Sequence, residues 1–161
     1  MNLFVKSMAV LSAVFLLAAC ETSPSSMSGK QGGGAAGGPV TPGSEQDLAQ
    51  NVGDRVFFDT DKSDLSADAQ QTLGRQAAWL KQYANVNVTV EGHCDERGTR
   101  EYNLALGERR AAAAKKYLVG LGIPASRIST ISYGKERPAV IGNDESAWSQ
   151  NRRAVTVVTN P

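Results

Sequence analysis

The spacing of apolar residues divides the last two thirds of the chain into short strands and longer helices. Residues 86–91 alternate strictly between apolar and polar side chains, which is typical of a half-buried strand. Three further segments are rich in β-branched or aromatic residues, which pack well on a pleated sheet. These predicted strands cover residues 55–58, 128–133 and 154–159.

Helical periodicity separates the first two predicted strands. An apolar stripe at intervals of three and four runs through residues 65–83 and consists of Leu65, Ala69, Leu73, Ala77 and Leu80. Ser66 is the expected N-cap of this helix, and Asp68 complements the helix dipole in its first turn. A short helix containing Trp148 is expected over residues 144–151.

The stretch over residues 99–121 also has helical periodicity, but a glycine interrupts it. One face of this stretch would carry Leu104, Ala111, Ala114, Leu118 and Leu121. Glycine costs about 1 kcal/mol in a helix interior and is acceptable as an N-cap. We therefore predict a short helical turn before Gly107 and a main helix over residues 108–121.

The predicted order β-α-β-α-β-(α)-β indicates an α/β (α+β) two-layer sandwich, with a small mixed sheet and helices on one face. Two strand–helix–strand units place the loops over residues 59–64 and 93–99 at the same sheet edge. Open α/β sheets usually bind ligands at the carboxyl ends of their strands. A binding site is therefore expected at this edge.

The first 19 residues have the pattern of a secretory signal peptide, with Lys6 before an apolar run that is too short for a comfortable membrane span. The run LAAC over residues 17–20 is similar to a bacterial lipobox, in which the cysteine is lipidated and the chain is cut before it. The alternative is an ordinary secretory signal with an incidental Cys20. By resemblance to bacterial lipoproteins, Glu21 favours sorting to the outer membrane.

The predicted domain boundaries follow from composition. Residues 20–50 are rich in Gly, Ser and Pro and cannot bury enough apolar surface to offset the entropy of ordering, so they are expected to form a tether behind the lipidated cysteine. Residues 51–161 are long enough for one domain with a modest core. This domain would face the periplasm.

Charge and cysteine content exclude several classes of protein. The chain has 17 Lys and Arg against 16 Asp and Glu, and it shows no basic stripe for nucleic acid. With Cys20 lipidated, Cys94 has no disulfide partner and is expected to pack as a small apolar residue. His93 and Cys94 together lack the three or four ligands of a zinc site, so we expect no metal and a buried or loop-ordering imidazole.

Asp95 and Arg110 are the candidate binding pair. If Gly107 caps the main helix, Arg110 lies in its first turn and its side chain points back towards the ligand edge. A carboxylate and a guanidinium held a ligand-width apart suit the ammonium and the carboxylate of a zwitterion. The alternative is a surface ion pair with a capping aspartate, which is common and nearly neutral in energy.

Four sequence runs together resemble the OmpA-like peptidoglycan-binding domain family. They are EGHCDERGTREYNLALGERRA at residues 91–111, FDTDKS at 58–63, SYGKERP at 132–138 and WSQNRRA at 148–154. The resemblance spans the whole predicted domain. The sequence departs from the family pattern at Cys94, where alanine is the expected residue.

The resemblance implies a ligand, a site and partners. The ligand would be the stem peptide of peptidoglycan, bound through meso-diaminopimelate by Asp95 and Arg110, with Phe58, Asp59 and Thr60 lining the pocket. The implied protein partner is the periplasmic propeller protein TolB, which would compete for the same face. TolA and other outer-membrane proteins are further implied partners. No cofactor is expected beyond the covalent lipid.

A peptidoglycan hydrolase and the wall-binding domain of a flagellar stator are the alternatives to a non-catalytic anchor. A peptidoglycan hydrolase would need two carboxylates across a cleft, a metal site or an activated nucleophile, and the loop with Asp95 and Glu96 offers none of these. We therefore expect no enzyme. The wall-binding domain of a flagellar stator would need a true transmembrane helix. Arg152 and Arg153 either flank the pocket or end the last strand.

Overall fold

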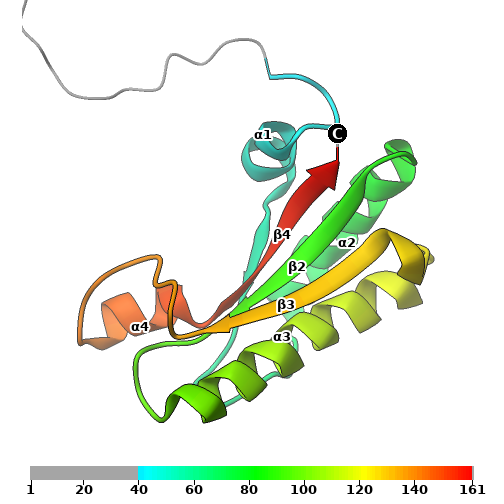
Figure 1. Cartoon of the computed structure of the whole chain (residues 1–161). Helices are drawn as coiled ribbons and strands as arrows, with labels where there is room; N and C mark the ends of the chain where they lie inside the picture. The colour runs from blue at the N-terminus through cyan, green and yellow to red at the C-terminus, as the bar shows by residue number, and fades with distance from the viewer. Residues whose placement is uncertain (1–39, 161) are drawn as a thin grey trace, which may run out of the picture. The chain divides into compact units, whose positions relative to one another are not determined.

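The computed structural model describes residues 40–160, coloured from cyan to red in Figure 1. Four strands alternate with helices in the predicted order. The elements are α1 (Glu45–Asp47), η1 (Leu48–Val52), β1 (Arg55–Phe57), α2 (Ala67–Gln82), β2 (Asn87–His93), α3 (Arg100–Gly120), η2 (Ala125–Arg127), β3 (Ile128–Gly134), α4 (Glu145–Asn151) and β4 (Arg153–Asn160). The signal peptide, the lipobox and most of the predicted tether lie outside the described residues.

The four strands form one mixed sheet in the order β1-β4-β2-β3. β4 runs antiparallel to both β1 and β2, whereas β2 and β3 are parallel and are joined by α3. In the view of Figure 1, α2 lies behind the sheet and α3 runs alongside β3. The fold is the predicted two-layer sandwich with a small mixed sheet and its two long helices on one face.

The core lies between the sheet and these two helices. Predicted stripe residues of α2 are buried, because the helix places every third or fourth side chain against the sheet. The cluster includes Val56, Leu73, Leu80, Val88, Val90, Ala114, Leu118 and Ile128. Ser66 caps α2 as predicted, since its Oγ accepts a hydrogen bond from the amide of Ala69 at 3.2 Å.

The predicted break at Gly107 is wrong, because α3 is continuous from Arg100 to Gly120. Its N-cap is Thr99, whose Oγ1 accepts from the amide of Tyr102 at 3.2 Å. Gly107 serves packing instead. A Cβ on Gly92 would lie 1.8 Å from the carbonyl oxygen of Gly107, so helix and strand touch backbone to backbone. Arg110 consequently lies in the third turn of α3, away from the N-terminal dipole.

The apolar face predicted for this helix is wrong at one position. Leu104 is 51 % exposed, whereas Leu106 is buried against the sheet. The close contact at Gly107 sets the rotation of α3, and this rotation turns Leu104 towards solvent. Leu118 and the two alanines at 111 and 114 are buried as predicted.

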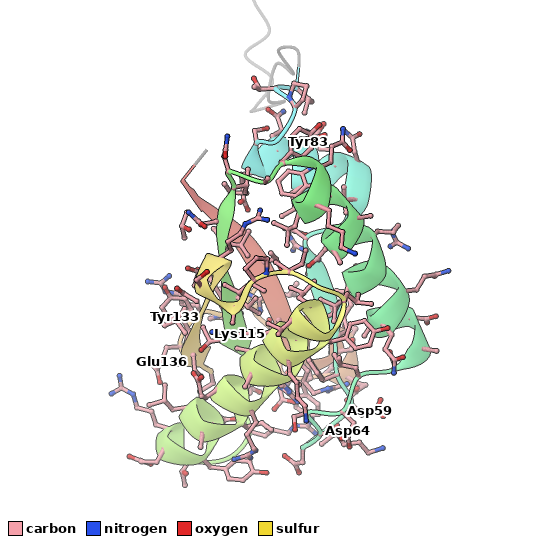
Figure 2. All side chains as sticks on the ribbon, turned by 90° about the vertical axis from the view of Figure 1, so that its right-hand side faces the viewer. Asp59, Asp64, Tyr83, Lys115, Tyr133 and Glu136 are labelled. Atoms are coloured by element: carbon pink, nitrogen blue, oxygen red, sulfur yellow. The ribbon has the colours of Figure 1, made fainter. Side chains whose placement is uncertain are left out.

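The folded region begins before the predicted boundary at residue 51. Leu48 is completely buried, and Oδ2 of Asp47 accepts hydrogen bonds from the Trp79 indole at 2.8 Å and from the amide of Gly43 at 2.9 Å. Figure 2 shows Tyr83 beside this N-terminal turn. A single buried leucine has no periodicity, so the sequence pattern carried no sign of this packing.

Candidate functional site

The carboxyl ends of β1, β2 and β3 meet the start of β4 at one end of the sheet (Figure 1). The two loops predicted to share an edge do meet here. Nη2 of Arg97, on the loop after β2, lies 3.3 Å from Oγ1 of Thr60 on the loop after β1. Figure 2 shows Asp59 and Asp64 on this first loop, which leads into α2.

Arg110 is fully buried, and its side chain connects α3 to the loop after β1 and to the end of β2. Its Nε donates to the carbonyl of Lys62 at 2.9 Å, Nη1 to that of His93 at 2.9 Å, and Nη2 to that of Asp59 at 3.1 Å. Its guanidinium also lies 5.2 Å from the ring centre of Phe58. Burial lowers the pKa of this arginine, which nevertheless remains a cation. The buried charge ties both site loops to α3.

Asp95 is a buried carboxylate paired with two other arginines. Arg97 donates to it three times, from its amide at 3.1 Å, from Nε at 3.1 Å and from Nη2 at 2.7 Å. Nη1 of Arg152 lies 3.5 Å from Oδ2. Burial alone would raise the pKa of Asp95, but the hydrogen bonds and charge of Arg97 outweigh burial and hold this pKa below its usual value. Asp95 is therefore a stable anion.

The expected face-to-face arrangement of Asp95 and Arg110 is not what the structure shows. Both belong to the same end of the sheet, but each is satisfied by other partners. Arg152 joins Asp95 to the loop after β1, because its Nε donates to the carbonyl of Phe58 at 3.0 Å. Its Nη2 pairs with Glu145 of α4.

An open groove of about 610 Å³ adjoins this cluster. Phe58, Asp59 and Arg152 line it together with the start of α2 and residues Ser149 and Gln150 of α4. Thr60 is exposed and does not line the groove, and the buried Asp95 and Arg110 are not among the lining residues either. Of the alternatives left open for Arg152, the structure shows that it flanks the groove.

The sequence assigns no site role to Arg97 or Trp148, and it predicts only a packing or turn role, or lining of the site, for Asn103. Arg97 covers Asp95, and its guanidinium lies 4.1 Å from the centre of the Trp148 ring. Asn103 holds the loop below them, since its amide donates to the carbonyls of Arg97 at 2.7 Å and Thr99 at 3.0 Å. All three lie within the recognised sequence runs, but spacing alone does not show which side chains pair across loops.

His93 and Cys94 are both buried, as predicted. The Cys94 thiol lies 3.3 Å from the carbonyl of Asn103, and burial raises its pKa, so it is a poor nucleophile. His93 has a pKa lowered to about 4, by burial first and then by the charges of Arg153 and Arg137. Within residues 40–160, no three His, Cys, Asp or Glu side chains gather as metal ligands. Nor does any helix of that region have the length and apolarity to cross a membrane.

The fold and this sheet edge define an OmpA-like α/β domain, and comparison with known proteins gives the same class. Residues 57–152 match the OmpA family. The chain belongs to the OmpA family.

Its relatives include peptidoglycan-associated lipoproteins, and its structural neighbours include one such lipoprotein and a domain of MotB. A peptidoglycan-associated lipoprotein of Rhizobium meliloti (strain 1021) is 58 % identical over 142 residues, covering 88 % of this chain and 81 % of the relative. The crystal structure of the peptidoglycan-associated lipoprotein from Burkholderia pseudomallei superposes with a TM-score of 0.64 at 40 % identity, covering 66 % of this chain and 90 % of that one. The C-terminal domain of Helicobacter pylori MotB shares the fold, with a TM-score of 0.63 at 20 % identity over 67 % of this chain and 85 % of that domain.

Proposed function

We propose that this protein binds peptidoglycan through the meso-diaminopimelate of the stem peptide and tethers the outer membrane to the wall. The observation that carries the proposal is the gathering of a buried carboxylate, Asp95, and two buried arginines, Arg110 and Arg152, at one end of the sheet, where Arg152 also lines an open groove. The far end of diaminopimelate carries one ammonium and one carboxylate. A fixed anion beside fixed cations matches both charges.

In this proposal Asp95 receives the ammonium. Its low pKa keeps it ionised at neutral pH, and its burial strengthens a charge-assisted hydrogen bond. The ligand carboxylate is held by Arg110, whose planar fork suits bidentate binding. Arg152 adds a second cation at the groove wall.

Access to Arg110 requires the loop after β1 to move, because the guanidinium is buried under the carbonyls of Asp59 and Lys62. Each of its terminal nitrogens carries two N–H groups and uses one for a carbonyl. A ligand carboxylate forms stronger hydrogen bonds than a neutral carbonyl does. We propose that the ligand carboxylate takes the place of loop carbonyls on these nitrogens.

We further propose that Cys20 carries the lipid and that the domain works in the periplasm within the Tol-Pal system, which supports envelope integrity and cell division. TolB would compete with the wall for this face, and TolA and other outer-membrane proteins would be further partners. The names of the relatives support the anchoring role. Catalysis is not proposed, because the low pKa of Asp95 is unsuited to a general acid at neutral pH.

The decisive experiment titrates a soluble stem tripeptide ending in meso-diaminopimelate into the purified domain by calorimetry. Asp95→Asn keeps the shape of the side chain and removes its charge, so binding should weaken at least tenfold, about 1.4 kcal/mol. Asp68→Asn is the matched control, because it removes the same charge from the exposed first turn of α2. Equal binding by both variants would disprove the assignment.

Arg110 is tested by Arg110→Lys, which keeps the charge and loses the fork. Three backbone hydrogen bonds depend on this guanidinium, so the variant is expected to lose stability as well as affinity. Amidating the carboxylate at the far end of diaminopimelate should weaken binding of the tripeptide strongly for the parent protein and only slightly for this variant. This comparison separates ligand contact from folding.

A further inference from the structure

The ammonium position that the proposed function assigns to Asp95 is already occupied by a cation of the same chain. Nε of Arg97 lies 3.1 Å from Oδ1 of Asp95, and its Nη2 lies 2.7 Å from Oδ2. This is the bidentate arrangement that a guanidinium makes with a carboxylate. Three donors of Arg97 and one of Arg152 already take the roughly four lone-pair sites of this carboxylate, so an incoming ammonium must replace one of these donors.

Arg97 is the replaceable partner of Asp95. Its side chain is 39 % exposed, whereas the side chains of Asp95 and Arg152 are 9 % and 7 % exposed. Arg152 is also held by the carbonyl of Phe58 and by Glu145, so it remains in place when Arg97 leaves. Release of the Arg97 side chain leaves no guanidinium hydrogen bond unsatisfied, because water can replace Asp95 as its partner.

The loop keeps its shape without the Arg97 side chain. The amide of Arg97 donates to Oδ1 of Asp95 at 3.1 Å, and the carbonyl of Arg97 is held by Asn103 at 2.7 Å. Both contacts use the backbone. The carboxylate therefore stays oriented after the guanidinium has moved.

Two residues other than Asp95 also contact the guanidinium of Arg97. It stacks at 4.1 Å on the ring of Trp148, and the indole of Trp148 donates to Glu96 at 3.2 Å. Nη2 of Arg97 also reaches Thr60 on the loop after β1. Arg97 thus joins α4 to both site loops across the position of the ligand.

We infer that Arg97 is a displaceable internal occupant of the ligand site, and that binding exchanges its guanidinium for the ammonium of the ligand on Asp95. This inference rests on the proposed function. The apparent affinity equals the intrinsic affinity multiplied by the fraction of molecules in which the Arg97 guanidinium has left Asp95. Only a ligand that brings its own cation restores the pairing of Asp95, so the exchange also selects against a neutral end group.

The test is the affinity of Arg97→Gln for the stem tripeptide ending in meso-diaminopimelate, measured by calorimetry on the folded variant. Removing the competitor should tighten binding up to about fivefold, which is the range expected for losing a partly exposed ion pair. Arg100→Gln is the matched control. It removes an equal charge three residues away, where Arg100 pairs with Glu136 at 3.3 Å and does not contact Asp95.

A second probe separates local exchange from a general change in charge. The same tripeptide with its side-chain amine acetylated has no ammonium for Asp95, so Arg97→Gln should bring no gain for it. Unchanged or weaker binding of the free tripeptide by Arg97→Gln, or an equal gain for both peptides, would overturn the inference. If the parent binds in an Asp95-dependent way in those cases, the proposed function stands. Absence of tripeptide binding in every variant would overturn both.

Discussion

Arginine residues at the two ends of the sheet bind backbone carbonyls that no sequence pattern connects. Arg110 joins the loop after β1 to the end of β2. At the opposite end, Arg127 donates to the carbonyls of Leu80, Tyr83 and Val86 and thereby closes the turn between α2 and β2. Each arginine satisfies several carbonyls that a turn leaves without helical or strand partners. Their first role is to order loops.

His93 makes the stability of the domain dependent on pH. The side chain is buried and its Nε2 lies 3.5 Å from Oε2 of Glu91, but burial and the charges of Arg153 and Arg137 prevail and lower the pKa from 6.5 to about 4. As the pH drops below 6.5, the unfolded chain binds a proton that the folded domain does not bind. Unfolding free energy should therefore fall by about 2 kcal/mol between pH 7 and pH 5.

Denaturant titrations at the two pH values measure this loss. His93→Gln should have a flatter dependence over the same interval, because the titrating group is gone. A nuclear magnetic resonance titration of the imidazole in the folded parent gives the pKa directly. A midpoint near 6.5 would contradict the proposed origin of the effect.

At the scale of elements, the contact between α3 and β2 depends on the absence of a side chain. A Cβ on Gly107 would lie 2.3 Å from Oγ of Ser132 and 3.0 Å from the carbonyl oxygen of Gly92. Gly107→Ala improves helix propensity by about 1 kcal/mol but forces helix and sheet apart. We expect a net destabilisation of about 1–3 kcal/mol in urea titrations.

Gly74 provides the matched control for that substitution. It lies inside α2, and a Cβ added there has no heavy atom within 4 Å. Gly74→Ala should therefore stabilise the domain, by up to about 1 kcal/mol. If Gly107→Ala is as stable as Gly74→Ala, the close contact does not set the position of α3.

At the scale of the whole molecule, attachment to the membrane is predicted to depend on one cysteine. Each buried CH₂ of an acyl chain contributes about 0.8 kcal/mol, and several chains on Cys20 would make release negligible. Cys20→Ala should leave a folded domain that is loose in the periplasm or retained as precursor. Fractionation of cell envelopes after a high-salt wash measures the difference.

Cys94→Ala is the control for this substitution, because the chain has only two cysteines and Cys94 is buried beside Asn103. This variant should stay with the outer membrane. Retention of Cys20→Ala in the washed outer membrane would show that another feature anchors the protein.

Local signals in the sequence sufficed for the order of elements and for the sheet edge at which the candidate site lies. Alternation and β-former composition predicted the four strands, and helical spacing predicted α2 and the part of α3 after Gly107. The cap at Ser66 acts on the amide of Ala69, three residues away, so it is visible in sequence too. The recognised runs placed Asp95 and Arg110 at the same edge.

Only the tertiary structure decided how α3 lies on the sheet and what the charged residues pair with. A glycine at position 107 fits a helix cap and a close backbone contact equally well. The contact with Gly92, which is 15 positions away, shows that Gly107 serves the second role. Asp95 pairs with Arg97 and with Arg152, which is 57 positions away, while Arg110 binds loop carbonyls. Leu48 is buried in the core, and Asp47 beside it meets Trp79 across 32 positions. Such contacts follow from packing of distant segments, whereas periodicity records only the burial of each segment by itself.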